Sequence, residues 1–153
     1  MDMAKQYLSK LSSVYTELNF RLPTEAEWEY GCRSGTATAF SYGPSFLRKN
    51  TRCHDNLPAS VDKYPPNDFG LYGMHGNVNE WCEDVYDAEA YAKRAQDYPL
   101  KNPLVKGKDT NRVARGGSFS DKCNYTRSAF RNYLEETSSM LTVGFRMVVE
   151  RKR

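Results

Sequence analysis

The first part of the chain carries apolar residues at helical spacing. They recur every three or four positions between residues 2 and 18, at Met3, Tyr7, Leu8, Leu11, Val14, Tyr15 and Leu18. This period predicts an amphipathic helix over residues 2–18. A second helix is predicted to begin after Thr24, because Thr24 and Glu27 stand at the N-cap and N3 positions of a capping box and follow Pro23. Ser34-Gly35 is predicted to end it.

Two later segments lack this periodicity. Residues 35–76 are rich in Gly, Pro, Asn and Asp, which predicts a long loop region with short strands. Residues 97–111 are predicted to form another loop, and residues 87–94 a helical turn. Loops of this length are often functional or held by an ion.

Alternating apolar and polar residues predict the strands. They are expected at residues 77–82, at residues 113–115 before a tight Gly-Gly turn, and at residues 143–149 as a central last strand. The fold class is therefore α+β, with two N-terminal helices, a small twisted antiparallel sheet and much irregular loop. A length of 153 residues fits one domain, residues 1–153, with a modest core.

Composition narrows the class of protein. Eleven Tyr residues in a chain that is 39% hydrophobic indicate a folded protein and also suit a binding surface. The net charge is only +3 and no basic stripe is present, so nucleic acid is not an expected partner. No apolar run approaches the roughly 18 residues of a membrane span, so no membrane insertion is expected. Without a signal peptide, the chain is cytoplasmic if it is complete, although a trimmed secreted protein would look the same.

The four cysteines are widely separated. Cys32, Cys53, Cys82 and Cys123 form no Cys-x-x-Cys motif, so a zinc site is poorly supported. Free buried thiols are the expected state, because a thiol packs as a small hydrophobic group. Two disulfides are the alternative if the protein is secreted.

Four blocks of sequence stand in a recognisable order. They are residues 21–30 (RLPTEAEWEY), 77–81 (NVNEW), 115–119 (RGGSF) and 144–146 (GFR). Together they resemble the formylglycine-generating enzyme (sulfatase-modifying factor) family from residue 3 to residue 149. The resemblance implies a C-type-lectin-like fold.

The resemblance also raises a question about the last strand. In that family the domain begins with strands upstream of the first helix here, and in lectin-like folds the first and last strands pair. The chain is therefore expected to lack the family's N-terminal strands. The exposed edge of its C-terminal strand is expected to be covered by the N-terminal segment or by another subunit, with self-association through this edge as one outcome.

The family's oxidase chemistry implies two Cys that bind copper shortly after the Gly-Gly-Ser motif. Asp121 and Thr126 occupy those positions here, and Cys123 lies between them, out of register. A carboxylate and a hydroxyl do not replace the soft thiolates that Cu(I) prefers, so neither copper nor formylglycine generation is expected. The alternative is a divergent oxidase that uses Cys123 and one other thiol.

Calcium is the metal that the resemblance favours. The resemblance implies that calcium is bound by the backbone carbonyls of Gly76 and Val78, by the Glu80 carboxylate and by the side chain at position 73. Gly73 stands where an Asp or Asn is expected, which removes one ligand. The alternative is that Glu80 hydrogen-bonds backbone amides and fixes the loop.

Two histidines are too few for the three-His iron centre of the family's sulfoxide synthases. His75 is expected to make a structural hydrogen bond. His54, between Cys53 and Asp55, is expected to be an exposed loop residue, with a transition-metal ligand as the alternative.

Further motif residues have structural interpretations. Asn79 stands where the family usually carries Trp, which removes a large aromatic side chain. Arg115, Arg127, Arg131 and Arg146 are expected to bridge strands and carbonyls, with anion binding as the alternative.

The same scaffold serves ligand-binding variable proteins that are diversified by retroelements. Their variable segment lies between Gly-Gly-Ser-aromatic and Gly-Phe-Arg, which here spans residues 119–143. The residues expected to face a ligand are Phe119, Asp121, Asn124, Tyr125, Thr126, Phe130, Tyr133 and Leu134. The sequence therefore favours a non-catalytic domain that binds a protein or cell-surface ligand. The alternatives are the divergent oxidase and a structural subunit that another chain completes.

Overall fold

The computed structural model describes residues 1–94 and 102–152. Its elements, in chain order, are α1 (Asp2–Val14), β1 (Leu18–Arg21), α2 (Glu25–Arg33), η1 (Arg48–Asn50), β2 (Asn79–Val85), α3 (Ala90–Arg94), β3 (Asn111–Arg115), η2 (Cys123–Thr126), β4 (Asn132–Glu135), β5 (Val143–Gly144) and β6 (Val148–Arg151). The expected α+β class is confirmed. Among the described residues, none of the helices has the length and apolar character needed to cross a membrane.

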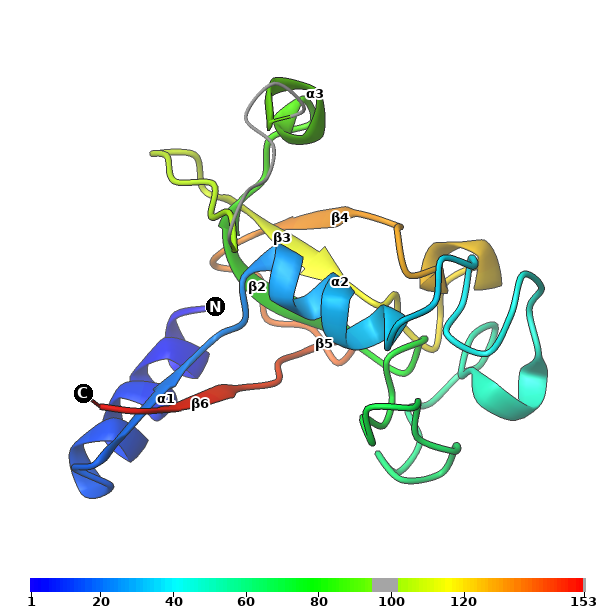
Figure 1. The fold of residues 1–153 in the computed structure, drawn as a ribbon, viewed down its shortest axis with the longest axis horizontal. Helices are drawn as coiled ribbons and strands as arrows, with labels where there is room; N and C mark the ends of the chain where they lie inside the picture. Colours follow the sequence, from blue (N-terminus) through cyan, green and yellow to red (C-terminus); the bar gives the residue numbers. More distant parts are fainter. Residues whose placement is uncertain (95–101, 153) are drawn as a thin grey trace.

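The strands form two sheets (Figure 1). One has four strands in the order β4-β3-β2-β5, antiparallel except for the two-residue parallel pairing of β2 with β5. The other is the antiparallel pair β1-β6, in which Leu18 faces Arg151 and Arg21 faces Val148. The C-terminal strand is thus paired with a segment close to the N-terminus, the first of the two arrangements expected for it.

Two predictions about the strands are wrong. Helix α1 was predicted to extend to residue 18 but ends at Val14, and Leu18 instead begins strand β1, because β6 supplies residues 18–21 with backbone partners. Residues 143–149 do not form one central strand. The chain leaves the larger sheet after β5 and joins the smaller one as β6, so that the alternating residues Phe145, Met147 and Val149 stay partly exposed.

The start of α2 forms as predicted. Thr24 Oγ1 accepts a hydrogen bond from the Glu27 amide (3.1 Å), and the Glu27 carboxylate accepts one from the Thr24 amide (2.8 Å). Ser34 ends the helix in the left-handed region, at φ 44°. The cap fixes the axis of the helix that covers β2 and β3.

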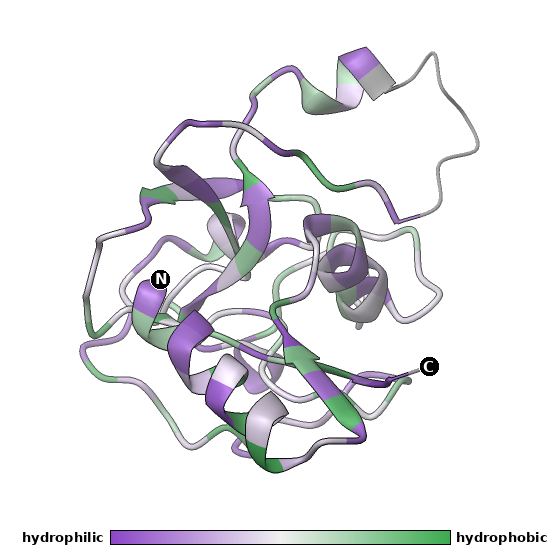
Figure 2. Cartoon of the chain, turned by 90° about the vertical axis from the view of Figure 1, so that its left-hand side faces the viewer, coloured by the Kyte–Doolittle hydropathy of each residue, from purple (hydrophilic) through white to green (hydrophobic). Residues whose placement is uncertain are grey.

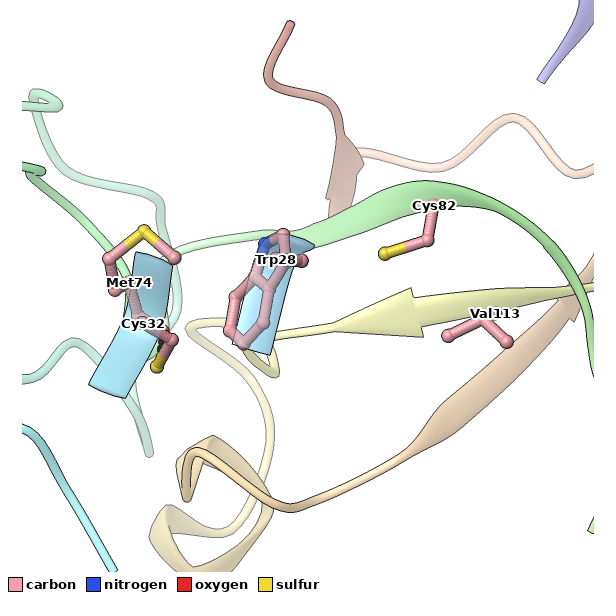
Figure 3. Packing of buried hydrophobic residues seen from close by; sticks show 5 residues of the cluster. All are labelled: Trp28, Cys32, Met74, Cys82 and Val113. Carbon is pink, nitrogen blue, oxygen red and sulfur yellow. Dashed lines mark hydrogen bonds between the residues drawn. The ribbon is translucent and has the colours of Figure 1, made fainter. Parts of the chain in front are cut away.

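Two hydrophobic clusters hold the elements together. One lies between α2 and the larger sheet and consists of Trp28, Cys32, Met74, Cys82 and Val113 (Figure 3). The other contains Met1, Leu8, Leu22 and Trp81 and joins α1 to the sheets. Figure 2 shows hydrophilic and hydrophobic residues alternating along α1, as expected for a helix with one buried face.

One disulfide joins Cys53 to Cys123, whereas Cys32 and Cys82 are free and buried. The expectation of free thiols is therefore wrong for two of the four cysteines. The loop around Cys53 reaches the later segment because the amides of His54 and Asp55 donate to the carbonyls of Asp121 (3.1 Å) and Phe119 (2.7 Å). The long loop is thus fixed against the candidate binding segment.

Candidate functional site

The Gly-Gly turn brings two of the sequence motifs into contact. Gly116 and Gly117 have φ of 91° and 69°, and a Cβ on Gly117 would lie 2.9 Å from the Tyr125 carbonyl oxygen. Only glycine fits this left-handed position and close approach. The Gly116 carbonyl accepts from the Gly76 amide (2.8 Å), and the Phe119 amide donates to the Asn77 carbonyl (2.8 Å). This pairing orients the segment that follows.

Asp121 lies at the first of the two expected copper positions and is engaged by the protein itself. Its Oδ2 accepts hydrogen bonds from the Ser118 amide (2.8 Å), the Ser118 hydroxyl (2.8 Å) and the Asn79 side-chain amide (3.2 Å). Asn79 in turn accepts from the Asn132 side chain (3.3 Å). The two departures from the family pattern, Asn79 and Asp121, thus contact each other in one polar network.

Thr126, at the second copper position, is fully buried. Its hydroxyl donates to the Cys123 carbonyl at 2.9 Å and closes the short helix η2. Cys123, between the two positions, is bonded to Cys53. Of the free thiols, burial raises the pKa of Cys32 to about 11 and that of Cys82 well above its usual value, which favours their protonated forms.

The eight residues expected to face a ligand do not all reach the surface. Phe119 (4% exposed) and Thr126 (0%) are buried, so their assignment to the surface is wrong. Both belong to backbone turns that pack against the core, which sequence periodicity does not reveal. The partly buried members are Asp121, Phe130 and Leu134, and the exposed ones are Asn124, Tyr125 and Tyr133. Tyr125 stacks on Phe130, with ring centroids 4.7 Å apart.

Glu80, the expected calcium ligand, is paired with protein groups. Its carboxylate accepts from Arg146 Nε (2.5 Å) and Nη2 (2.9 Å) and from the Trp28 indole (2.7 Å). The alternative expectation of backbone amides as its partners is wrong, because side chains occupy both oxygens. Among the residues that the structure describes, no group of three or more His, Cys, Asp or Glu side chains could hold a metal ion. Glu80 and Arg146 instead lie beside a cleft of about 410 Å³.

His75 makes the structural hydrogen bonds that were expected of it. Its Nδ1 lies 2.8 Å from the Thr126 carbonyl, and its Nε2 accepts from the Ser41 amide (3.0 Å). Nδ1 therefore carries the proton and donates, and the ring is neutral. Burial lowers the pKa of His75 below its usual value. His54 is an exposed loop residue with φ 53°, as expected.

The motif arginines bridge parts of the fold. Arg115 is fully buried and donates to the carbonyls of Ser128 and Phe130 and to the Glu29 carboxylate. Arg131 makes a bidentate pair with Glu25 (2.6 and 2.8 Å). The expectation of structural bridging is confirmed for both and for Arg146.

The buried carboxylates were not found from the sequence. Glu25, which binds Arg131, is buried, and so is Asp84, whose carboxylate accepts from the Glu25 amide at 2.7 Å. From the sequence alone, a charged residue is predicted to be exposed to solvent. Only the structure, which places an oppositely charged or hydrogen-bonding partner beside it, shows that it is buried. Burial is common for such groups only when they are paired.

Comparison with known proteins places these observations in context. The family model for the "Sulfatase-modifying factor enzyme 1-like domain" matches residues 2–151. The formylglycine-generating enzyme of Streptomyces coelicolor is 36% identical over 146 residues, which cover 82% of this chain and 45% of the enzyme. A protein named serine/threonine-protein kinase pkn1 from Chlamydia pneumoniae is 35% identical over 137 residues, 88% of this chain and 22% of that protein.

Solved structures show the same scaffold. PvdO from Pseudomonas aeruginosa superposes with a TM-score of 0.82 and 28% identity, covering 97% of this chain and 58% of PvdO. Treponema denticola variable protein 1 superposes with a TM-score of 0.72 and 30% identity, covering 87% of this chain and 48% of that protein. The expected C-type-lectin-like fold is thereby confirmed. The chain spans less than half the length of the formylglycine-generating enzyme and of the variable protein.

Proposed function

This chain belongs to the sulfatase-modifying factor enzyme 1-like family, and we propose that it is a non-catalytic member that binds a protein or cell-surface ligand. The observation that carries the proposal is the state of the two copper positions. Asp121 is hydrogen-bonded to Ser118 and Asn79, and Thr126 is buried against the Cys123 carbonyl. Neither side chain offers the soft ligand that a redox copper ion needs.

The proposed binding surface lies on residues 119–143. Of the eight residues expected there to face a ligand, the exposed ones are Asn124, Tyr125 and Tyr133, and the Tyr125 ring is held against Phe130. Tyrosine and asparagine suit this role, because rigid aromatic rings give contact area at low entropic cost and amides adapt their hydrogen bonds. The similarity to a variable protein supports a surface whose sequence changes on a constant frame.

The test combines binding and turnover. Ligands selected against the whole chain from a displayed protein library should lose at least about tenfold in affinity for the triple variant Asn124→Ala/Tyr125→Ala/Tyr133→Ala, which removes two aromatic contacts. The control is Asn19→Ala/Tyr15→Ala/Tyr30→Ala, which truncates side chains of the same types elsewhere. Oxidation of a cysteine peptide in the presence of Cu(I) would refute the proposal, as would selected ligands that bind both variants equally.

A divergent oxidase is the second candidate, and one observation favours it. Cys53 and Cys123 are adjacent, and a two-electron reduction of their disulfide by an added dithiol would give two neighbouring thiols. Two thiolates are the donors that Cu(I) prefers. Titration of the reduced chain with Cu(I) separates the candidates: one tight equivalent that is lost in Cys53→Ser, together with peptide oxidation, supports the oxidase.

A subunit completed by another chain is the third candidate. Met3, Tyr7 and Met147 are exposed on α1 and just before β6. Met3 lines a cavity of about 360 Å³ together with Met1, Trp81 and Phe145, and the Tyr7 ring contacts that of Phe145 (centroids 6.2 Å apart). Apolar side chains gathered in this way are a frequent mark of a protein interface. Self-association through the outer edge of β6 is part of this candidate, and the mass in solution from light scattering tests it.

A further inference from the structure

A group of aromatic side chains surrounds Arg131 beside β4. The ring centroids of Tyr86 and Tyr133 are 4.4 Å apart, and the Arg131 guanidinium carbon lies 5.0 Å from the centre of the Tyr86 ring and 4.8 Å from that of Tyr91. We call Tyr86, Tyr91 and Tyr133 the tyrosine cluster. Two of its members come from residues 86–91, outside the segment that the sequence singled out.

The tyrosine cluster is both fixed and accessible. Arg131 is held beneath it by Glu25 and by the Asp87 carbonyl (2.9 Å). About half of Tyr91 and of Tyr133 is nevertheless exposed, at 49% each. Rings whose positions are already set lose little conformational freedom when a partner binds.

The charges around the cluster are mostly negative. Asp87 and Glu89 stand between Tyr86 and Tyr91 in the chain, and Glu135 stands two residues after Tyr133. Among the described side chains, Lys93 pairs with Asp87 (2.9 Å) and with Glu89 (3.3 Å). Glu135 lies two residues from Tyr133 on β4 and therefore points to the same side of the strand. This acidic border contrasts with the net charge of +3 of the whole chain.

We propose that the tyrosine cluster is a docking surface for an arginine- or lysine-bearing segment of the protein ligand. Aromatic faces attract cations, and the protein's own Arg131 already stacks on two of these rings. The carboxylates of Glu89 and Glu135 attract the same partner at longer range. The inference rests on the proposed function and extends its surface from residues 119–143 to residues 86–91.

Addition of a strand to β4 fits the structure less well than side-chain recognition. The Tyr133 amide already donates to the Asn132 side chain (2.9 Å), and the Glu135 carbonyl accepts from the Ser138 amide (2.8 Å). A peptide that paired with this edge would have to displace both bonds. Contact with the exposed rings of Tyr91 and Tyr133 and with the Glu135 carboxylate breaks neither bond, and contact with Glu89 replaces its exposed pair with Lys93 (3.3 Å).

The probes for the test are three capped peptides of equal length with Gly-Ser spacers, carrying Arg, Lys or Glu. Binding to the whole chain is followed by amide chemical-shift changes and by fluorescence anisotropy at low and physiological salt. We expect the Arg and Lys peptides to shift residues 86–91 and 131–135, and the Glu peptide to shift neither. The Tyr91→Ala/Tyr133→Ala variant should weaken binding about tenfold, whereas Tyr7→Ala/Tyr30→Ala, which removes exposed rings elsewhere (51% and 70% exposed), should not.

A charge reversal provides the second variant, because it leaves all the rings in place. Glu89→Lys/Glu135→Lys should weaken the basic peptides and remove most of the salt dependence. Unchanged binding in both variants, or shifts spread over the whole surface, would overturn the proposal. If a selected ligand loses affinity when Asn124 and Tyr125 are replaced, but the basic peptides do not bind, this inference is refuted and the proposed function stands. Copper-dependent oxidation of a peptide would refute the proposed function.

Discussion

Replacement of Asp121 by Ala tests whether this residue holds the fold or faces a ligand. The Asp121 carboxylate accepts three hydrogen bonds, from the Ser118 amide, the Ser118 hydroxyl and the Asn79 side chain. Ser118 is 1% exposed and Asn79 is 5% exposed, so water cannot easily replace the lost acceptor. The substitution should therefore lower the free energy of unfolding.

The size of this decrease in the free energy of unfolding follows from the hydrogen-bond donors that are left without an acceptor. The Ser118 hydroxyl also lies 3.1 Å from the Ser120 hydroxyl and keeps that partner, so two donors lose their acceptor. A buried donor without a partner costs about 1–3 kcal/mol, which gives an expected loss of about 2–6 kcal/mol for the two donors. For a chain of this size that corresponds to a fall in Tm of about 4–24 °C. Asp121→Asn keeps an acceptor but loses its charge, and should cost about 1 kcal/mol.

Urea denaturation monitored by the fluorescence of Trp28 and Trp81 measures these differences, because both rings are buried. The control is Glu89→Ala, which removes a carboxylate that is 73% exposed and should leave the urea midpoint unchanged. If Asp121→Ala unfolds at the same midpoint as Glu89→Ala, the carboxylate is solvated and free for a ligand. The structural role assigned to the Asn79–Asp121 network would then be wrong.

Three further outcomes are expected. Addition of about 1 mM calcium should change Tm by less than about 1 °C relative to a sample with chelator, because Arg146 and Trp28 occupy the Glu80 carboxylate oxygens. A larger rise in Tm that the Glu80→Gln variant abolishes would show a calcium site. Replacing Cys53 and Cys123 by Ala should lower the free energy of unfolding, measured by urea denaturation, by up to about 4 kcal/mol, because the disulfide closes a loop with a sequence separation of 70 residues. A dithiol should destabilise the wild type but not the double variant. Burial lowers the pKa of His75, so the folded state binds fewer protons than the unfolded state below about pH 6.5. The stability from the neutral ring is thus fully present above that pH and is lost as the pH falls towards the lowered folded pKa, and His75→Asn should show a smaller change in urea midpoint between about pH 7 and pH 5.

Local signals in the sequence predicted local structure correctly. The capping box at Thr24 and Glu27 and the stop at Ser34 need only neighbouring residues, and both form as expected. The Gly-Gly turn likewise follows from a backbone conformation that glycine alone adopts easily. The structural hydrogen bonds of His75 and the bridging by Arg115 and Arg146 were also predicted, from their places in the motifs, and the bridging by Arg131 from its place near the motif-bearing strands.

The predictions of strands and their boundaries that depended on distant pairing partners failed. Leu18 continues the helical spacing of residues 2–18 but begins a strand, because β6 pairs with residues 18–21. Phe145 and Met147 alternate like strand residues, yet the chain crosses between two sheets at that point and leaves both partly exposed. Register and partner choice in a sheet are set by other parts of the chain, which a periodicity does not contain.

The sequence by itself determined the family and the α+β class, because both depend on residue identity and order. It also determined that Asp121 and Thr126 stand where the resemblance implies two Cys. Tertiary structure alone decided that Asn79 and Asp121 share one hydrogen-bond network, that Cys53 bonds Cys123, and that the rings of Tyr86 and Tyr133, 47 positions apart, contact each other. The physical reason is that a hydrogen bond, a disulfide or a ring contact depends on distance in space, which residues far apart in the sequence acquire only when the chain folds.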